Sequence, residues 1–208
     1  MTTNFDHLTP KKEGVTLNIQ DTLSLEVPTD LSDIADCYNE EWDDDSGQAH
    51  EIKNFIELTK DKNCLLDIGG NIGFMSLAFL INNNDEAKKY SYCIEPSKIG
   101  VHTLGRILVH NDEDERLDNV YVYEIFMGDK QGQCEFLIER GSNTLSVTYE
   151  KKDDPRFQIE THGAPPSYSE MSTVDDFYRY LIDKRRPLPD TIKIDVEGYD
   201  YRVLLGAE

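Results

Sequence analysis

Residues 65–80 read LLDIGGNIGFMSLAFL, which is typical of a short apolar strand, a turn of small residues and an apolar helix. The adjacent glycines Gly69 and Gly70 let the backbone turn sharply and approach a ligand, and Gly73 lets the helix pack close to the strand. Backbone N–H groups at the start of such a helix bind carboxylates and phosphates. The pattern indicates a site for a nucleotide-like cofactor, with a plain tight turn as the alternative.

The charge and the glycine spacing of this turn favour one class of cofactor. The dinucleotide fingerprint G-x-G-x-x-G is absent, because the glycines stand at 69, 70 and 73. Asp67, at the end of the strand, would repel a pyrophosphate and attract an ammonium or sulfonium group. S-adenosylmethionine carries both of these cations and no phosphate. It is therefore the predicted cofactor, and NAD is the weaker alternative.

The length and composition of the chain narrow its class. Its 208 residues suit one domain with a sizeable core. A formal net charge of −20 disfavours nucleic acid and anionic membranes as partners, so a small or neutral substrate is predicted. The N-terminus lacks the basic start and apolar core of a signal peptide, and no stretch approaches membrane-spanning length, which predicts a cytoplasmic location.

The cysteines and the acidic run at 43–45 give no sign of a metal site. Cys37, Cys64, Cys93 and Cys134 stand far apart and form no C-x-x-C pair, so buried thiols are predicted. The three aspartates of the acidic run are followed by no EF-hand spacing, which is typical of a solvated loop.

Alternating strand and helix patterns predict a parallel sheet with helices on both faces. Ser97 is the expected N-cap of the second of these helices. The strands are expected at 64–68, 90–94, 120–126, 171–174 and 191–196, and the helices at 72–81, 98–110, 175–184 and from 199 onward.

Other segments are predicted to lie outside this alternating pattern. Residues 15–27 alternate apolar and polar side chains, as a half-buried strand or a hairpin would. Residues 134–138 and 144–149 predict an antiparallel pair, and the charged, proline-rich segment 150–168 predicts a surface lobe over the cleft. We therefore expect an N-terminal strand and helix extension over 1–60, and a cofactor domain over 61–208 with an irregular insert at about 130–170.

Carboxylates are predicted to end the strands of the alternating set. In open parallel sheets, ligands bind beyond the carboxyl ends of the strands, so these side chains are candidate site residues. Glu95 stands where an acidic residue accepts from both hydroxyls of a ribose, and Asp129 could accept from the amino group of an adenine. The four acids are Asp67, Glu95, Asp129 and Asp195.

Five segments of the chain together resemble one enzyme family. They are LDIGGNIGF at 66–74, CIEPS at 93–97, VDDF at 174–177, IKIDVEG at 192–198 and LLGA at 204–207. The pattern is similar to that of the FkbM-type methyltransferases, which use S-adenosylmethionine mostly to methylate hydroxyl groups of sugars and natural products. The resemblance covers about residue 50 to the last residue. It implies an α/β fold, the Rossmann-like class I methyltransferase sandwich with a mostly parallel sheet.

The resemblance also implies roles for particular residues. Asp195 and Glu197 would lie beside the transferring methyl group. Ser142 and Asn143 match a family loop near the acceptor. The residues that the resemblance implies in holding the cofactor are Asp67, Gly69, Asn71, Gly73 and Glu95.

The residues themselves agree with a catalytic role for Asp195 and Glu197. Two acids at i and i+2 at the end of a buried strand point the same way, and Gly198 permits a sharp exit. A hydroxyl acceptor is a poor nucleophile, so methyl transfer needs proton removal and in-line alignment. Either acid could be the base. The alternatives are that one orients the acceptor, that the pair holds a divalent cation, that Glu197 only caps the next helix, or that His162 is a second base.

These patterns predict an S-adenosylmethionine-dependent O-methyltransferase that acts on a hydroxyl group of a small molecule, sugar or natural product. The alternative is a non-catalytic cofactor-binding module of the same fold. In this family another strand and a closing antiparallel pair follow the Gly-Ala segment. Because the chain ends at Glu208, we expect a fragment of a longer protein, or a truncated product, that lacks these C-terminal strands.

Overall fold

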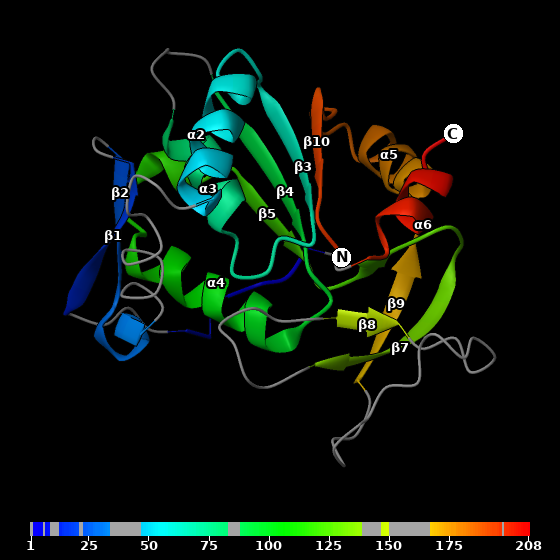
Figure 1. Cartoon of the computed structure of the whole chain (residues 1–208), viewed down its shortest axis with the longest axis horizontal. Helices are drawn as coiled ribbons and strands as arrows, with labels where there is room; N and C mark the ends of the chain where they lie inside the picture. Colours follow the sequence, from blue (N-terminus) through cyan, green and yellow to red (C-terminus); the bar gives the residue numbers. More distant parts are fainter. Residues whose placement is uncertain are drawn as a thin grey trace.

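A computed structural model shows an α/β fold built around a four-stranded parallel sheet (Figure 1). Its strands are β3 (Cys64–Ile68), β4 (Tyr90–Ile94), β5 (Val120–Tyr123) and β10 (Thr191–Ile194). They lie in the order β10-β3-β4-β5, and each neighbouring pair is parallel. The structure describes residues 2–5, 7–8, 13–20, 23–33, 47–82, 88–138, 147–149, 167–196 and 198–208.

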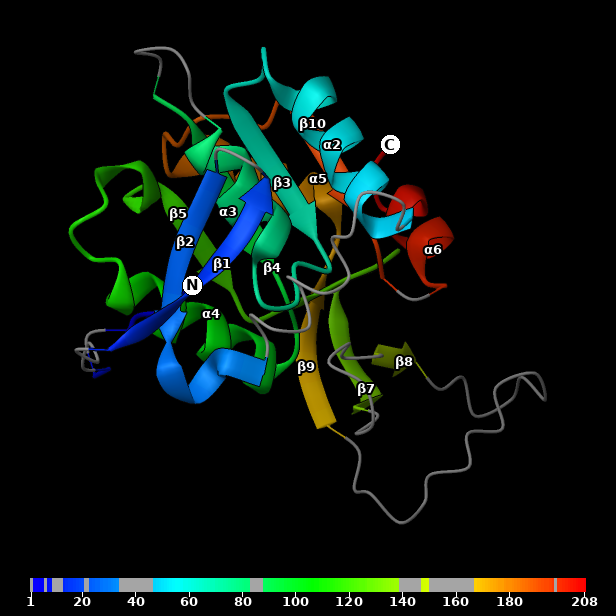
Figure 2. The same ribbon diagram turned by 60° about the vertical axis from the view of Figure 1, so that its left-hand side comes forward.

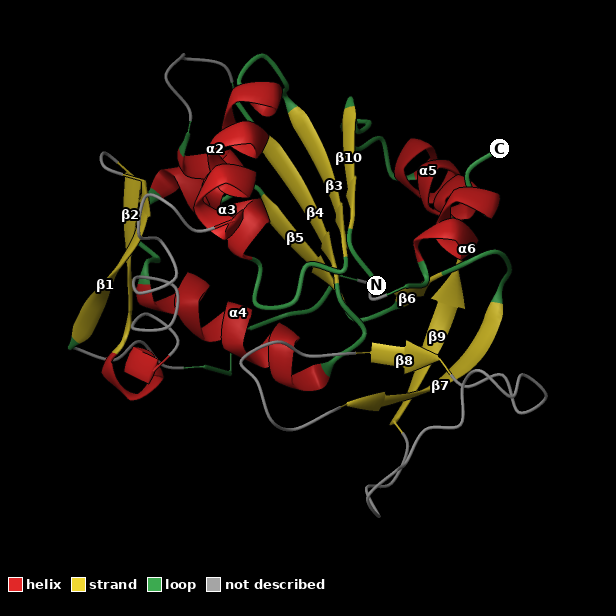
Figure 3. Cartoon of the chain, in the orientation of Figure 1, coloured by secondary structure: helices red, strands yellow, loops and turns green. Residues whose placement is uncertain are grey.

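Helices cover both faces of the sheet, which confirms the predicted Rossmann-like fold class (Figures 1 and 3). One face carries α2 (Gly47–Thr59), α3 (Phe74–Ile81) and α4 (Lys98–His110). The other carries α5 (Val174–Asp183) and α6 (Asp200–Leu205). Two short 3₁₀ helices are η1 (Thr29–Leu31) and η2 (Glu115–Leu117).

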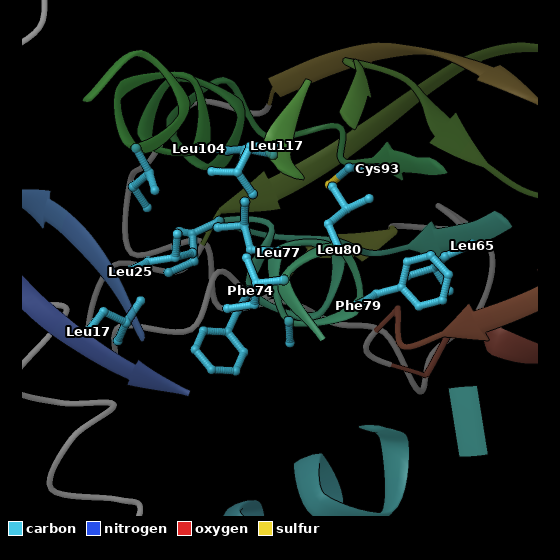
Figure 4. Close-up of a cluster of buried hydrophobic side chains, with 14 of the residues drawn as sticks. Leu17, Leu25, Leu65, Phe74, Leu77, Phe79, Leu80, Cys93, Leu104 and Leu117 are labelled. Atoms are coloured by element: carbon cyan, nitrogen blue, oxygen red, sulfur yellow. The ribbon is translucent and has the colours of Figure 1, made fainter. Parts of the chain in front are cut away.

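The alternation of side chains along β3 divides the core into two clusters. Leu65 packs with α3 and α4 on one face, whereas Leu66 and Ile68 pack with α5 and α6 on the other. All five residues of β3 are buried, as expected for the central strand of a sheet covered on both faces. Figure 4 shows the first cluster, which runs from Leu17 and Leu25 past Phe74 and Leu77 to Leu65.

The N-terminal hairpin joins this first cluster. β1 (Gly14–Gln20) and β2 (Leu23–Pro28) are antiparallel, so the alternating segment at 15–27 is a hairpin. Leu17 and Leu25 are buried against α3 and α4, and β2 contacts α4 (Figure 2). The described residues before position 61 therefore share a core with the parallel sheet.

A second sheet follows β5 in the sequence, and two of the strand predictions were wrong because of it. It contains β6 (Phe126–Met127), β9 (Ser167–Ser172), β7 (Gly132–Ile138) and β8 (Val147–Tyr149), in that order. β7 and β8 form the predicted antiparallel pair. The C-terminal bound of the strand predicted at 120–126 was wrong, because β5 ends at Tyr123. The strand predicted at 171–174 belongs to β9 and pairs with β7 and β6, not with the parallel sheet.

The physical reason lies in the apolar run that links β5 to β6. Phe126 and Met127 are buried like Val122 and Tyr123 of β5, but Phe126 packs with Phe136 and Met171 in a third cluster. The run VYVYEIFM at 120–127 therefore serves two sheets, and Glu124 is the one charged residue in it. Periodicity alone does not separate one long buried strand from two short ones.

Two predictions from composition concern cysteines and membrane spans. Cys64, Cys93 and Cys134 are buried free thiols, as predicted, and Cys37 lies outside the described residues. Within the described part of the chain, every helix is too short or too polar to cross a bilayer.

Candidate cofactor and active site

The order of the parallel strands places a switch point beside β3. From β3 the chain moves outward through β4 to β5, and β10 then pairs on the opposite side of β3. In open α/β sheets, ligands bind at such a point, beyond the carboxyl ends of the strands. Gly69 directly follows β3, and Asp195 directly follows β10. The N–H of Asp195 donates to the carbonyl of Ile68 at 3.1 Å, so the two strand ends lie together.

The glycine turn is fixed by close packing on both sides. Gly69 has a φ of 75°, and a Cβ atom there would lie 2.0 Å from the carbonyl oxygen of Asp195. A Cβ atom at Gly70 would lie 2.2 Å from the buried sulfur of Cys93. The N–H groups of Gly69 and Gly70 both donate to the carbonyl of Ile94 at 3.0 Å. The chain therefore needs both glycines for its own packing, in addition to any close approach of a ligand.

Two further residues of the turn complete the entry into α3. Gly73, with a φ of 80°, is the N-cap, and a Cβ atom there would overlap Leu104 of α4. Gly73 was predicted to let the helix pack close to the strand, whereas the close neighbour of this glycine is Leu104 of α4. Asn71 has a φ of 50°, and its buried Oδ1 atom accepts no hydrogen bond from the described residues. Since buried polar atoms are normally paired, this amide oxygen is a candidate acceptor for a ligand group.

Asp67 has partners within the protein. Its side chain is 0% exposed, and Oδ2 accepts from the hydroxyl of Ser76 at 2.8 Å. The hydroxyl of Ser91 donates in turn to that of Ser76 at 2.9 Å. Oδ1 lies 3.2 Å from the Nζ atom of Lys193. Sequence reasoning expected a cofactor cation beside Asp67, and the structure places the ammonium group of Lys193 there.

Lys193 is a site residue that sequence reasoning missed. It is the register partner of Asp67 across β10 and β3. Its Nζ atom donates to the carbonyl of Gly69 at 3.0 Å and lies 3.6 Å from Oδ2 of Asp195. Burial alone would lower the pKa of Lys193, but the charges of Asp67 and Asp195 outweigh it and raise that pKa above its usual value. The side chain is therefore an ammonium ion.

Glu95 directly follows β4 and ties the turn to α4. Its side chain is 3% exposed. Oε2 accepts from the N–H of Asn71, and Oε1 accepts from the N–H of Ser97, both at 2.8 Å. Ser97 caps α4 as predicted, since its hydroxyl accepts from the N–H of Gly100. Burial raises the pKa of Glu95 to about 7, although the two N–H groups act in the opposite direction.

This raised pKa predicts a pH dependence of stability that comes from Glu95. Between its usual pKa of 4.5 and about 7, the folded chain holds a proton that the unfolded chain has lost. The unfolding free energy should therefore fall as the pH rises through this window, by up to about 3 kcal/mol, and stay level above it. Glu95→Gln removes the titrating group, so urea unfolding at pH 5 and pH 8 should show a smaller difference for the variant. Equal pH differences in the two proteins would contradict the prediction.

Asp195 is the accessible acid of the site. Its side chain is 65% exposed at the carboxyl end of β10, and it faces the ammonium group of Lys193. Asp200 follows it at the start of α6, and its carboxylate accepts from the N–H of Val196 at 3.3 Å. The other residues predicted near the methyl acceptor lie outside the described residues; they are Glu197, Ser142, Asn143 and His162.

Asp129 does not end a strand of the parallel sheet, so this prediction was wrong. It follows β6 in the second sheet, and its carboxylate pairs with Arg202 of α6 at 2.5 Å. The acid that directly follows β5 is Glu124. Glu124 lines a cavity of about 560 Å³ together with Lys98 and Ile99 from the first turn of α4. Glu124 therefore has the strand-end position that was predicted for Asp129.

The comparison with protein families decides the broad class of this chain. The family model described as "Methyltransferase FkbM domain" matches residues 67–208. The chain belongs to this family. The matched part of this FkbM chain begins at Asp67, near the end of β3, and contains the glycine turn and the strand-end acids described above, so the family resemblance is confirmed.

A solved structure similar to this FkbM chain is the crystal structure of methyltransferase FkbM from Methylobacillus flagellatus KT. The two are 20% identical, with a TM-score of 0.45. The match covers 71% of this chain and 29% of that chain, so the sequence spans less than a third of the length of that structure. No curated protein sequence matches the chain.

Proposed function

We propose that this methyltransferase binds S-adenosylmethionine at the carboxyl edge of its parallel sheet and methylates a hydroxyl group of a small molecule, sugar or natural product. The observation that carries the proposal is the glycine turn at the switch point, with Glu95 and Asp195 at the ends of the strands on either side of β3. Membership of the FkbM family supports the reaction class.

The residues of this edge fit such a cofactor. The turn carries no side chain at Gly69 and Gly70, so a ligand can approach its backbone closely. Asp67 and Asp195 both lie beside the ammonium group of Lys193, so the carboxylates outnumber the cation at this edge. An acidic edge attracts a cationic cofactor and repels a diphosphate. The NAD alternative therefore finds no support in these contacts.

The acids have different tasks in this proposal. Glu95 is buried beside the turn and accepts two backbone N–H groups, and its remaining lone pairs suit the two hydroxyls of a ribose. Asp195 is exposed, so it would accept the proton of the acceptor hydroxyl as the new bond to the methyl carbon forms. When bound, S-adenosylmethionine supplies an electrophilic methyl group on a sulfonium centre. Glu197 keeps its place as the alternative base.

Binding and transfer can be tested separately. Isothermal titration with S-adenosylhomocysteine should show saturable binding, and titration with NAD should show none. Asp195→Asn should keep the affinity for S-adenosylhomocysteine, since Lys193 retains Asp67 as its counter-charge, and lower methyl transfer about 100-fold or more, because the proton acceptor is lost. Transfer is measured with labelled S-adenosylmethionine across a panel of sugar and small-molecule hydroxyl acceptors.

Three outcomes would count against the proposal. Absence of heat with S-adenosylhomocysteine would overturn cofactor binding. Comparable binding of NAD would revive the dinucleotide alternative. Cofactor binding without transfer to any acceptor, unchanged in Asp195→Asn, would favour the non-catalytic binding module.

A further inference from the structure

Lys193 joins three parts of the switch point through one ammonium group. Its Nζ atom lies 3.0 Å from the carbonyl oxygen of Gly69, 3.2 Å from Oδ1 of Asp67 and 3.6 Å from Oδ2 of Asp195. These atoms belong to the turn, to β3 and to the end of β10. The ammonium group thus donates a hydrogen bond to Gly69 and forms ion pairs with two carboxylates.

The contact with Gly69 locks one peptide unit of the turn. The carbonyl of the Gly69–Gly70 peptide accepts from Lys193, and the N–H of the same peptide donates to the carbonyl of Ile94. Both polar ends of this peptide are thus held, one from β10 and one from β4. Without Lys193, the carbonyl end would lose its partner, although the positive φ of Gly69 would still allow other orientations.

Stability alone is a poor explanation for a lysine at this position. The side chain is 16% exposed and stands between Ile192 and Ile194 on β10. Replacing a buried ion pair with apolar residues of similar volume is often neutral or stabilising, because taking charges out of water is costly. A charged residue here is better explained by the arrangement of the site around it.

We propose that Lys193 is a positioning residue for methyl transfer, which holds the cofactor turn and the exposed carboxylate of Asp195 in a fixed relation. This inference rests on the proposed function. In this proposal Lys193 acts neither as the base nor on the acceptor, since its polar neighbours are groups of the protein itself. Its effect reaches the reaction through Gly69 on the cofactor side and through Asp195 on the acceptor side.

The test compares three variants of the whole chain. Lys193→Met keeps the length of the side chain and removes its charge, and Lys193→Arg keeps the charge. Lys88→Met is the matched control, since Lys88 is exposed just before β4, at the opposite edge of the sheet. Each protein is titrated with S-adenosylhomocysteine, and amide hydrogen exchange of residues 69–73 is measured without ligand.

Lys193→Met should weaken S-adenosylhomocysteine binding about 10-fold or more and speed amide exchange at Gly70, because a hydrogen bond from a charged donor is lost. Lys193→Arg should recover most of the affinity, because it keeps the positive charge. If only the size of the lysine side chain mattered, Lys193→Arg would not bind more tightly than Lys193→Met. Lys88→Met should match the wild type. If Lys193→Met does not fold, Asp67→Asn/Lys193→Met replaces it, since this pair leaves no unmatched buried charge.

Wild-type affinity in a folded Lys193→Met protein would overturn the inference while leaving the proposed function intact. Equal losses in Lys193→Met and Lys193→Arg would also overturn it, because charge would then not matter. If the wild type itself binds no S-adenosylhomocysteine, the proposed function fails, and the inference fails with it.

Discussion

Replacing Gly69 with alanine is expected to abolish cofactor binding and to lower the unfolding free energy by about 3 kcal/mol. The left-handed φ of 75° disfavours any Cβ atom, and this Cβ would lie 2.0 Å from the carbonyl oxygen of Asp195. That oxygen is backbone, so it cannot rotate away as a side chain could. The end of β10 must move, and it carries both Lys193 and Asp195. Urea unfolding and titration with S-adenosylhomocysteine measure the two effects.

Gly198→Ala separates backbone strain from the steric clash. Gly198 has a φ of 84°, close to that of Gly69, but a Cβ atom there would meet nothing within 4 Å. Its cost should be only the strain of the left-handed conformation, about 1 kcal/mol. The difference between the two variants is then the cost of displacing β10. Equal destabilisation by both, or wild-type affinity in Gly69→Ala, would show that the turn does not depend on this packing.

The second large effect is expected at Asp67. Asp67→Asn keeps the shape of the side chain and an acceptor for Ser76, but it leaves the ammonium group of Lys193 without its buried counter-charge. Breaking a buried pair in this way should lower the unfolding free energy by about 3 kcal/mol or more. The measurement is urea unfolding at pH 7, where the lysine is charged.

A double-mutant cycle shows whether this loss comes from the pair. Asp67→Asn/Lys193→Met should cost at least about 2 kcal/mol less than the sum of its single variants, because no unmatched charge remains. Glu57→Gln is the control, since Glu57 pairs with Lys60 on the exposed face of α2. Its effect should lie within experimental error, as is usual for surface ion pairs. Strict additivity of Asp67→Asn and Lys193→Met would mean that the two residues do not depend on each other.

The features of this fold that depend on neighbouring residues were predicted correctly from the sequence. β3 and β4 have the predicted bounds, because short, mostly apolar runs bounded by turn residues mark buried strands. α4 begins after Ser97, as its cap pattern predicts. These features depend on residues close together in the chain.

The predictions that were wrong concern features that depend on residues far apart in the chain. Asp129 was placed at the wrong strand because the break between β5 and β6 reflects pairing with β9, more than 40 residues later. Lys193 was missed because its role depends on pairing with Asp67 across two strands, and no local sequence pattern shows that register. The glycines were explained by a ligand, whereas much of their requirement comes from Asp195 and Cys93.

The central claim is that a sulfonium-bearing cofactor lies over the glycine turn with its ribose held by Glu95. A crystal structure of the protein with S-adenosylhomocysteine tests it most directly. The account predicts the ligand across Gly69 and Gly70, with its ribose hydroxyls within hydrogen-bond distance of Glu95 and its sulfur on the side of Asp195. A ligand bound at another edge of the sheet, or one whose ribose makes no contact with Glu95, would contradict it.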